Sequence, residues 1–224
     1  MAMRIACGVL LFLAGASVAS ANDAVLDEAL ARKALPAAEV QGSVRTTTLV
    51  TGGDEPETET SIVDPRKRPD KALASYAELK AVIGTGAHVV ERQTGRTIYA
   101  FTTRHVPRTL ARAGNVSIDM DGKDDDEQFD GKAEVSLDAT GRPYVSRLDL
   151  RLSEPAGNLL AKVKKIDLSY TFGPAAHADA MVATAMSVDV DVRALLFVHR
   201  TAHAEAVLMP DAPEASKTPA PSTK

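Results

Sequence analysis

The sequence predicts a mainly β protein with a small α component: an antiparallel, curved sheet or half-open β-barrel with one packed helix. Two observations support this expectation. Several segments alternate apolar with polar or charged side chains, which is typical of strands with one buried face and one face in water. Short turns rich in Gly, Asp and Pro separate most of these segments, and one stretch between them has clear helical spacing. The pattern indicates about eight or nine strands.

Composition limits what the core is made of. Hydrophobic residues make up 45% of the 224-residue chain, but aromatic residues only 4%, and Trp is absent. The core must therefore be mainly aliphatic. The single cysteine, Cys7, lies near the N-terminus, so we expect no disulfide in the folded domain. The formal net charge of −4 indicates no dominant basic face, and we expect no nucleic-acid partner.

The N-terminal segment has the order of a secretory signal peptide. Arg4 supplies a positive charge, residues 5–18 are almost entirely apolar, and Ala19-Ser20-Ala21 forms a small-residue cleavage motif. The sequence therefore predicts a signal peptide over residues 1–21 and a periplasmic mature protein. Cys7 is a poor lipoprotein acceptor because the apolar run follows it. This run is too short to span a membrane as a helix, and we expect no transmembrane segment in the mature chain.

The first half of the mature chain predicts two helical segments around a hairpin. Residues 22–40 have near-helical apolar spacing and predict a short N-terminal helix. Residues 44–50 and 58–63 are rich in β-branched side chains and predict two antiparallel strands. Residues 72–83 predict a helix that ends at Gly84 and closes over a sheet. The residues that share its apolar face are Leu73, Tyr76, Leu79 and Ile83.

The second half predicts a series of strands. Residues 87–92 and 96–104 flank a compact turn, and residues 112–130 are acidic and predict an irregular segment. Further strands are expected at 132–137, 144–152, 165–172, 182–192 and about 195–208. We therefore expect one curved antiparallel β domain over residues 41–209, with the helix inserted. Residues 210–224 lack periodicity and predict a disordered tail.

The apolar face of these strands is the candidate ligand-binding surface. A preformed apolar cleft binds hydrophobic molecules by burying them. The alternative is an ordinary core, since small barrels usually fill with side chains. The residues assigned to this face are Val135, Leu137, Leu148, Leu150, Ile166, Leu168, Tyr170, Phe172, Val188 and Val190.

The order of strand-like segments and turns in the second half of the sequence resembles that of a known family. It runs from Phe129-Asp-Gly-Lys-Ala-Glu-Val through Asp138-Ala-Thr-Gly-Arg-Pro to Leu148-Asp-Leu-Arg-Leu152, then Val163–Phe172 and Arg193–Arg200. Over about residues 44–208 the chain resembles the bacterial outer-membrane lipoprotein-sorting and carrier proteins, the LolA/LolB-like group. The resemblance implies a half-open β-barrel plugged by helices, with a cavity for acyl chains. It transfers no set of functional residues, and the carriers have a more aromatic lining.

Motifs for catalysis or metal binding are missing or mis-spaced. In the acidic run from Asp119 to Glu127, Gly122 comes too early for an EF-hand loop, which favours a solvated loop. His199 and His203 are four residues apart on an expected strand, which separates them by about 13 Å. The chain has no G-x-S-x-G motif and no phosphate-binding glycine loop. We therefore expect a protein that is not an enzyme and has no cofactor and no metal site.

These expectations favour a periplasmic protein that binds a hydrophobic small molecule, lipid or acyl chain in an apolar half-barrel. The alternative is an envelope interaction or structural protein with a filled core, which docks a protein partner through exposed strand edges or its tail. A hydrolase assembled from residues distant in the sequence is a third hypothesis. The basic loop Arg66-Lys67-Arg68 favours solvation over contact with an anionic membrane.

Overall fold

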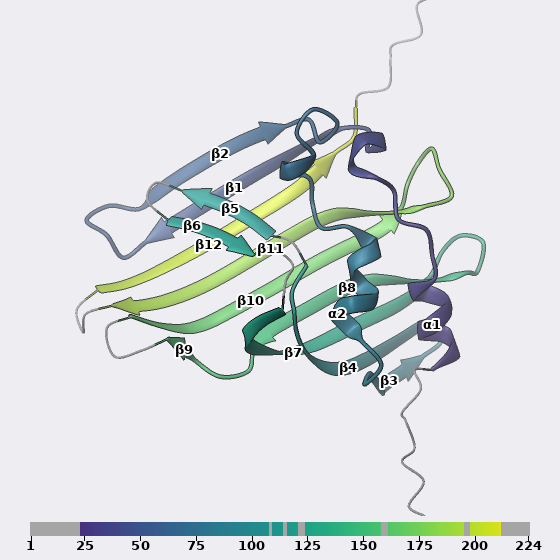
Figure 1. Ribbon diagram of the computed structural model, residues 1–224. Helices are drawn as coiled ribbons and strands as arrows, with labels where there is room; N and C mark the ends of the chain where they lie inside the picture. The colour runs from purple at the N-terminus through teal and green to yellow at the C-terminus, as the bar shows by residue number, and fades with distance from the viewer. Residues whose placement is uncertain are drawn as a thin grey trace, which may run out of the picture.

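The computed structural model is dominated by one large antiparallel sheet that curves but does not close (Figure 1). The structure describes residues 23–107, 109–113, 116–120, 124–157, 161–194 and 198–211. The expected signal peptide and nearly all of the expected tail lie outside these residues. Ten strands form the sheet, in the order β2-β1-β12-β11-β10-β8-β7-β4-β3, with the short β9 paired to β10. The predicted fold class is confirmed.

The strands vary in length, and the longest lie in the middle of the sheet. The main sheet contains β1 (Ser43–Thr51), β2 (Glu57–Val63), β3 (His88–Gln93), β4 (Arg96–His105), β7 (Asp124–Leu137), β8 (Pro143–Leu152), β9 (Ala156–Gly157), β10 (Ala161–Pro174), β11 (Met181–Ala194) and β12 (Val198–Met209). A separate two-stranded hairpin contains β5 (Thr109–Ala113) and β6 (Val116–Met120). Every pairing within the main sheet is antiparallel, so short hairpin turns connect most neighbours.

Cross-strand register gives the sheet one apolar face and one charged face. Leu150, Leu168, Val188 and Ala204 form one row across four strands, and all are buried. The next row along consists of Arg151, Asp167, Asp189 and His203, and it points to the opposite side. Successive residues of a strand point to opposite faces, so alternation in the sequence becomes separation in space.

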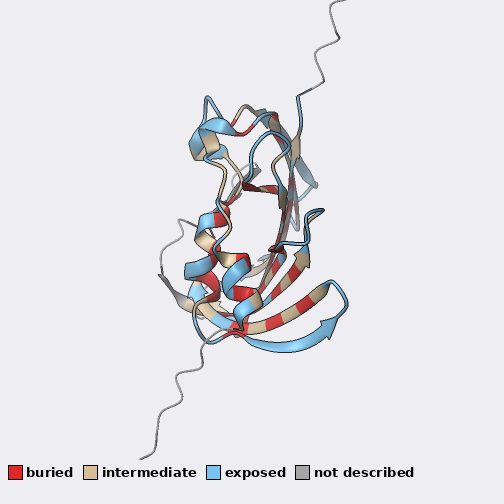
Figure 2. Cartoon of the chain, turned by 90° about the vertical axis from the view of Figure 1, so that its right-hand side faces the viewer, coloured by how far each residue is buried: buried red, intermediate tan, exposed pale blue. Residues whose placement is uncertain are grey.

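Short helices cover the apolar face (Figure 2). They are α1 (Ala24–Leu30), η1 (Ala37–Glu39), η2 (Pro69–Lys71), η3 (Tyr76–Glu78) and α2 (Leu79–Ile83). Leu26 in α1 and Leu79 in α2 are fully buried in the same core as the strands. The ring of Tyr76 contacts that of Phe172 edge to face, with 5.4 Å between the centroids. The core therefore lies between the sheet and this helical cover.

Both predicted helical segments are shorter than expected. The helix expected over 72–83 begins only at Tyr76, because Ser75 and Glu78 form a capping box at its start. It ends at Gly84, which has a φ of 62°. The segment expected to be helical over 22–40 contains α1, and then the chain runs extended past Ala34, which bridges to Met181.

The expectation of an irregular segment over 112–130 is wrong. This stretch contains β6 and the first part of β7, which starts at Asp124. The acidic composition suggested a loop, but β7 pairs with β4, for example at Asp130 and Thr102. Cross-strand pairing therefore overrides the low β-propensity of these residues. The unpredicted strands β5, β6 and β9 also raise the number of strands above the expected eight or nine.

Gly131 allows the neighbouring strands β4 and β7 to pack closely. It lies opposite Phe101, and a Cβ at this position would come within 2.3 Å of the Phe101 ring. We predict that Gly131→Ala lowers the free energy of unfolding by about 1–3 kcal/mol, as overpacking does. Urea denaturation measures the change. Gly86→Ala is the matched control, because its Cβ would meet nothing within 4 Å. Equal stability of the two variants would contradict the prediction.

Candidate functional site

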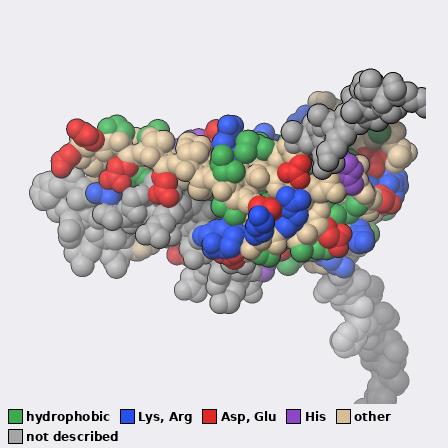
Figure 3. Space-filling view, turned by 90° about the horizontal axis from the view of Figure 1, so that it is seen from above, with side chains coloured by type: hydrophobic (Ala, Val, Ile, Leu, Met, Phe, Trp, Pro, Cys, Tyr) green, Lys and Arg blue, Asp and Glu red, His purple; other side chains and the backbone are tan. Residues whose placement is uncertain are grey.

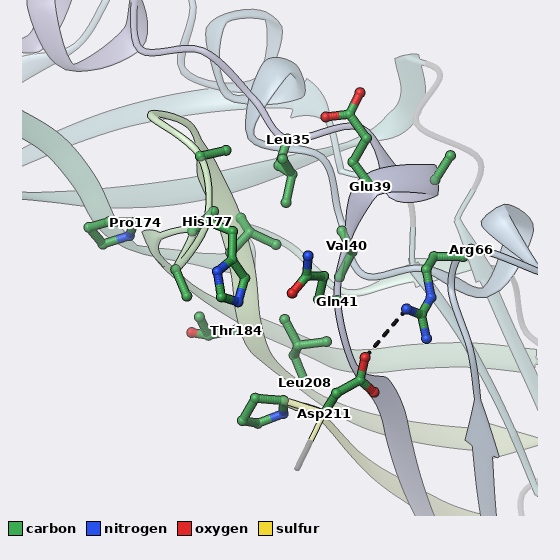
Figure 4. Close-up of a pocket in the computed structure, with 16 residues that line it drawn as sticks. Leu35, Glu39, Val40, Gln41, Arg66, Pro174, His177, Thr184, Leu208 and Asp211 are labelled. Atoms are coloured by element: carbon green, nitrogen blue, oxygen red, sulfur yellow. Dashed lines mark hydrogen bonds and ion pairs between the residues drawn. The ribbon is translucent and has the colours of Figure 1, made fainter. Parts of the chain in front are cut away.

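A cleft of about 610 Å³ opens at one end of the sheet, where three segments meet (Figure 4). The first is the linker between α1 and β1, residues 35–41. The second is the turn between β10 and β11, residues 174–178, and the third is the end of β12 with residues 210–211. The cleft therefore lies between elements that are far apart in the sequence.

The lining of the cleft is mainly apolar. Leu35, Val40 and Leu208 surround the same space, and Gln41 and His177 also point toward it (Figure 4). The remaining lining residues are Ala38, Glu39, Arg66, Pro174, Ala175, Ala176, Ala178, Val182, Thr184, Pro210 and Asp211. An apolar wall with a few polar groups is the usual composition of a small-molecule site, since the apolar part supplies affinity and the polar groups fix orientation.

A small inner pocket adjoins the cleft. It has a volume of about 50 Å³, lies between the cover and the sheet and reaches Tyr76 and Met181. Four residues line both the cleft and this pocket. They are Leu35, Val40, Val182 and Leu208. The cleft and the inner pocket are therefore neighbours that share a wall.

An arginine closes one side of the cleft through two carboxylates. The guanidinium of Arg66 donates to Asp64 at 2.9 Å and to Asp211 at 3.3 Å. The hydrogen bond from Arg66 lowers the pKa of Asp64, and Asp64 raises the pKa of Arg66. Both acids are partly exposed, so these pairs contribute little to stability. They position a charged group at the rim of an apolar site.

A second arginine fastens the linker to the sheet. Arg32 donates to Asp138 at 2.9 Å, and both side chains are almost completely buried. Asp138 also accepts hydrogen bonds from the hydroxyl and N–H of Thr140, which lower the pKa of its carboxyl well below the usual range. Arg142 joins the β7–β8 turn to Asp179 on the β10–β11 turn, at 2.6 Å. This network fixes the base of two cleft walls.

The linker beyond Arg32 has few backbone attachments. Leu35 donates its N–H to Met181, and Met181 donates its own N–H to Lys33. Over residues 36–40 the backbone bonds that the structure shows are local, from Glu39 to Pro36 and from Val40 to Ala37. This part of the cleft wall therefore depends on side-chain packing rather than on a strand ladder, and it is the part most easily displaced.

Most of the predicted ligand-binding residues lie in the core rather than in the cleft. Val135, Leu148, Leu150, Leu168, Tyr170, Phe172 and Val188 are buried under the cover. Ile166 and Val190 are partly buried against them. Leu137 is different, because it lies at the end of β7 and is 51% exposed. The strands thus share the expected apolar face, but none of these ten residues lines the cleft.

The cleft residues had no clear signal in the sequence. Leu35 and Val40 lie in the linker on either side of the short helix η1, and Val182 and Leu208 lie near strand ends. Val182 points away from the core, because its neighbours Met181 and Ala183 are the buried ones. Hydrophobic periodicity identifies the middle of an element and says little about its ends. A run of small and apolar residues at 174–178 between two strands was the one available hint.

A second hollow, of about 850 Å³, lies on the charged face of the sheet. Its walls carry charges that are already paired, such as Arg147 with Asp149 at 2.9 Å and Arg151 with Asp167 at 3.1 Å. Solvent and these internal pairs satisfy such a groove without a ligand. The apolar cleft is therefore the stronger candidate.

The histidines of β12 pair with aspartates instead of with each other. His203 bonds Asp189 at 2.8 Å and contacts Glu205 at 3.3 Å, while His199 bonds Asp191 at 2.9 Å. Asp189 lies directly opposite Asp167, so a positive charge on His203 offsets repulsion between these two acids. The hydrogen bond with Asp189 raises the pKa of His203.

The described residues contain neither a metal cluster nor a membrane-spanning helix. No group of three or more His, Cys, Asp or Glu side chains there could hold a metal ion. The side chains of the acidic run from residue 119 to 126 lie outside the described residues. Among the described helices, none is long and apolar enough to cross a membrane.

Comparison with known proteins adds no relative. No protein-family model, no curated protein and no solved structure matches this chain. The function must therefore be argued from the geometry described above.

The hydroxyl of Tyr76 joins the cover to the sheet. It donates to the carbonyl of Ala29 at 2.9 Å and accepts from the N–H of Val145 at 2.7 Å. Burial raises its pKa to about 12.

We predict that Tyr76→Phe lowers the free energy of unfolding by about 1–3 kcal/mol, because the buried N–H of Val145 loses its partner and the carbonyl of Ala29 keeps only the longer bond from the N–H of Arg32, at 3.3 Å. Chemical denaturation measures the loss. Tyr144→Phe serves as the control, since no hydrogen bond of the Tyr144 hydroxyl is seen in the described structure and it is only half-buried. An equal decrease in the free energy of unfolding in both variants would contradict the prediction.

His203 makes stability depend on pH. A pKa raised in the folded state adds stability below the unfolded pKa, and this stability is lost as pH rises through the folded pKa. We therefore predict that His203→Gln destabilises the protein more at about pH 5.5 than at about pH 8.5. Urea midpoints at both values provide the measurement. The exposed His177, which has no carboxylate partner in the described chain, supplies the control variant His177→Gln. A pH-independent effect of His203→Gln would contradict the assignment.

Proposed function

We propose that this protein is a non-enzymatic carrier or binding protein that takes up a hydrophobic molecule with a polar end, such as a lipid or acyl chain, through the cleft between linker 35–41 and the β10–β11 turn. The observation that carries the proposal is the apolar cleft of about 610 Å³, which shares four lining residues with the pocket under the cover. Its volume is in the range of small-molecule sites.

The arrangement of charge supports a ligand with two unlike ends. The interior side of the cleft is bordered by Leu35, Val40 and Leu208, which favour an apolar chain. Arg66 lines the cleft and pairs with the carboxylates of Asp64 and Asp211. His177 also lines the cleft. An anionic or hydrogen-bonding head group is therefore best accommodated beside Arg66, where it competes with Asp211.

The resemblance of the strand pattern in the sequence to the LolA/LolB-like group supports the same class of ligand, a lipid or acyl chain. The signal-peptide order of residues 1–21 supports a periplasmic location. N-terminal sequencing of the exported protein tests this location, and a chain that retains Met1 in the cytoplasmic fraction would count against it.

A second function, docking of a protein partner by a protein with a filled core, is favoured by a different observation. The apolar face expected to hold the ligand is already covered by α1, η3 and α2. If the core stays closed, the surface and edges of the sheet carry the function.

The first test is native mass spectrometry of the protein purified from the periplasm, followed by lipid extraction. We predict a bound apolar molecule, and enhanced fluorescence when the purified protein is mixed with cis-parinaric acid. Ala38→Trp, which fills the cleft from the linker, should weaken this binding by at least about tenfold.

Ala77→Trp is the matched control, because Ala77 is also exposed but lies on η3 and does not line the cleft. It should bind like the wild type. A clean apo mass together with no binding of cis-parinaric acid would refute the ligand proposal and favour the docking function.

A further inference from the structure

Strand β2 forms an open edge of the sheet. It pairs with β1 on one side, without any register shift, and it is the last strand in the order on the other side (Figure 1). Its seven residues, Glu57–Val63, are exposed except for Val63, which is intermediate. The outer N–H and C=O groups of such a strand are free to pair with another chain.

The opposite edge is protected, whereas the β2 edge is not. β3 has a bulge between Val89 and Glu91, and Arg92 forms an ion pair with Asp23, which caps α1. Natural sheets protect their edges with bulges, prolines and charged side chains, lysine above all. Within Glu57–Val63 there is no bulge, proline or lysine, and the charged residues are Glu57 and Glu59. The two edges therefore differ, and β2 remains a regular template for pairing.

The two ends of the β2 edge carry opposite charge. Figure 3 looks down on this edge and shows acidic side chains toward one end and Lys and Arg side chains further along. The acidic group is Asp54, Glu55, Glu57 and Glu59, and the described structure shows no ion pair for any of these four side chains. The basic group after the strand is Arg66, Lys67, Arg68 and Lys71. Arg66 pairs with Asp64 and Asp211, and Arg68 pairs with Asp70, so Lys67 and Lys71 are the cations of this group that have no ion pair in the described structure.

We propose that β2 pairs in antiparallel fashion with β2 of a second copy of this chain, around a two-fold axis near Thr60. This arrangement brings the acidic end of each copy to the basic end of the other. With the axis at Thr60, Glu57 lies opposite Val63 and Glu59 lies opposite Ser61. Parallel pairing would place like charges directly opposite each other, which is destabilising. The charge pattern of β2 therefore favours a second copy of the chain as the partner and antiparallel pairing of the two strands.

An exposed apolar side chain gains cover in this dimer. Ile62 is 63% exposed on the charged face, in the same cross-strand row as Arg45 and Val207. In the paired sheet it lies opposite Thr58 of the second copy, and its exposure falls. The two-fold symmetry provides this contact twice, as in any isologous interface.

The dimer is expected to be weak and sensitive to salt. A seven-residue strand is about 20 Å long, so strand pairing buries less area than a standard stable interface. The charges involved are exposed, and salt screens them over about 10 Å at 0.1 M ionic strength. We therefore expect a reversible equilibrium that shifts toward the monomer as salt is added. This inference does not depend on any ligand in the cleft.

Sedimentation velocity of the purified protein over a concentration series tests the proposal. We expect a monomer–dimer equilibrium at low salt, and Glu57→Lys/Glu59→Lys should abolish the dimer because the acidic end of the edge then has no net charge to attract the basic end of the other copy. Asp27→Lys/Glu154→Lys changes the same number of exposed acids elsewhere and should leave the dimer intact. A monomer at every concentration, or a dimer that survives Glu57→Lys/Glu59→Lys, would overturn the proposal.

A charge swap tests whether the two ends of the β2 edge contact each other across the dimer. Lys67→Glu/Lys71→Glu makes both ends acidic and should also give a monomer. Mixing this variant with Glu57→Lys/Glu59→Lys should restore a dimer, since the lysines introduced at positions 57 and 59 of one copy then meet the acidic end introduced at positions 67 and 71 of the other. Relative to each variant alone, the mixture should show added hydrogen-exchange protection of the β2 amides and no change at the β3 amides. Absence of a mixed dimer, or protection at β3 instead, refutes the arrangement.

Discussion

The buried hydroxyl of Tyr76 is the interaction on which the concave side of this molecule depends. One oxygen satisfies the carbonyl of Ala29 at the end of α1 and the N–H of Val145 in β8. Val145 lies at the register shift between β7 and β8, where strand pairing is interrupted. A bulge leaves backbone groups without a ladder partner, and Tyr76 supplies one from the cover. The ring of the same residue packs against Phe172, so one side chain joins helix, cover and sheet.

Uneven anchoring of the cover explains where the cleft lies. Near Tyr76 and Arg32 the cover is held by buried hydrogen bonds and a buried ion pair. Toward β1 the linker over residues 36–40 shows only local backbone bonds, and it crosses the sheet beside small residues such as Ala175 and Ala183. Small side chains below this loosely attached linker cannot fill the space to native density. The cleft is thus a consequence of how the chain returns from α1 to β1.

Sequence patterns predicted the middle of this fold better than its ends. Alternation over 144–152 and 165–172 identified β8 and β10 because alternate side chains are buried along β8 and, in β10, from Leu168 to Phe172. The same alternation misplaced Leu137, since β7 ends there and leaves no cover above it. The partnership of Arg32 with Asp138 spans 106 residues and has no local signature. The cleft is built from such long-range neighbours, so a single sequence contains no pattern that identifies it.

The cleft and the open edge share one segment, the loop after β2. Arg66 lines the cleft and also belongs to the basic end of the edge, where it already binds Asp64 and Asp211. Acidic side chains of a second copy at that end would compete with Asp211 for the same guanidinium. Any such competition changes the rim of the cleft, and linkage requires that a ligand bound at the rim changes the dimer equilibrium by the same factor. In the proposed dimer, edge pairing is therefore coupled to ligand uptake through Arg66. The apolar walls formed by Leu35 and Val40 are independent of the edge.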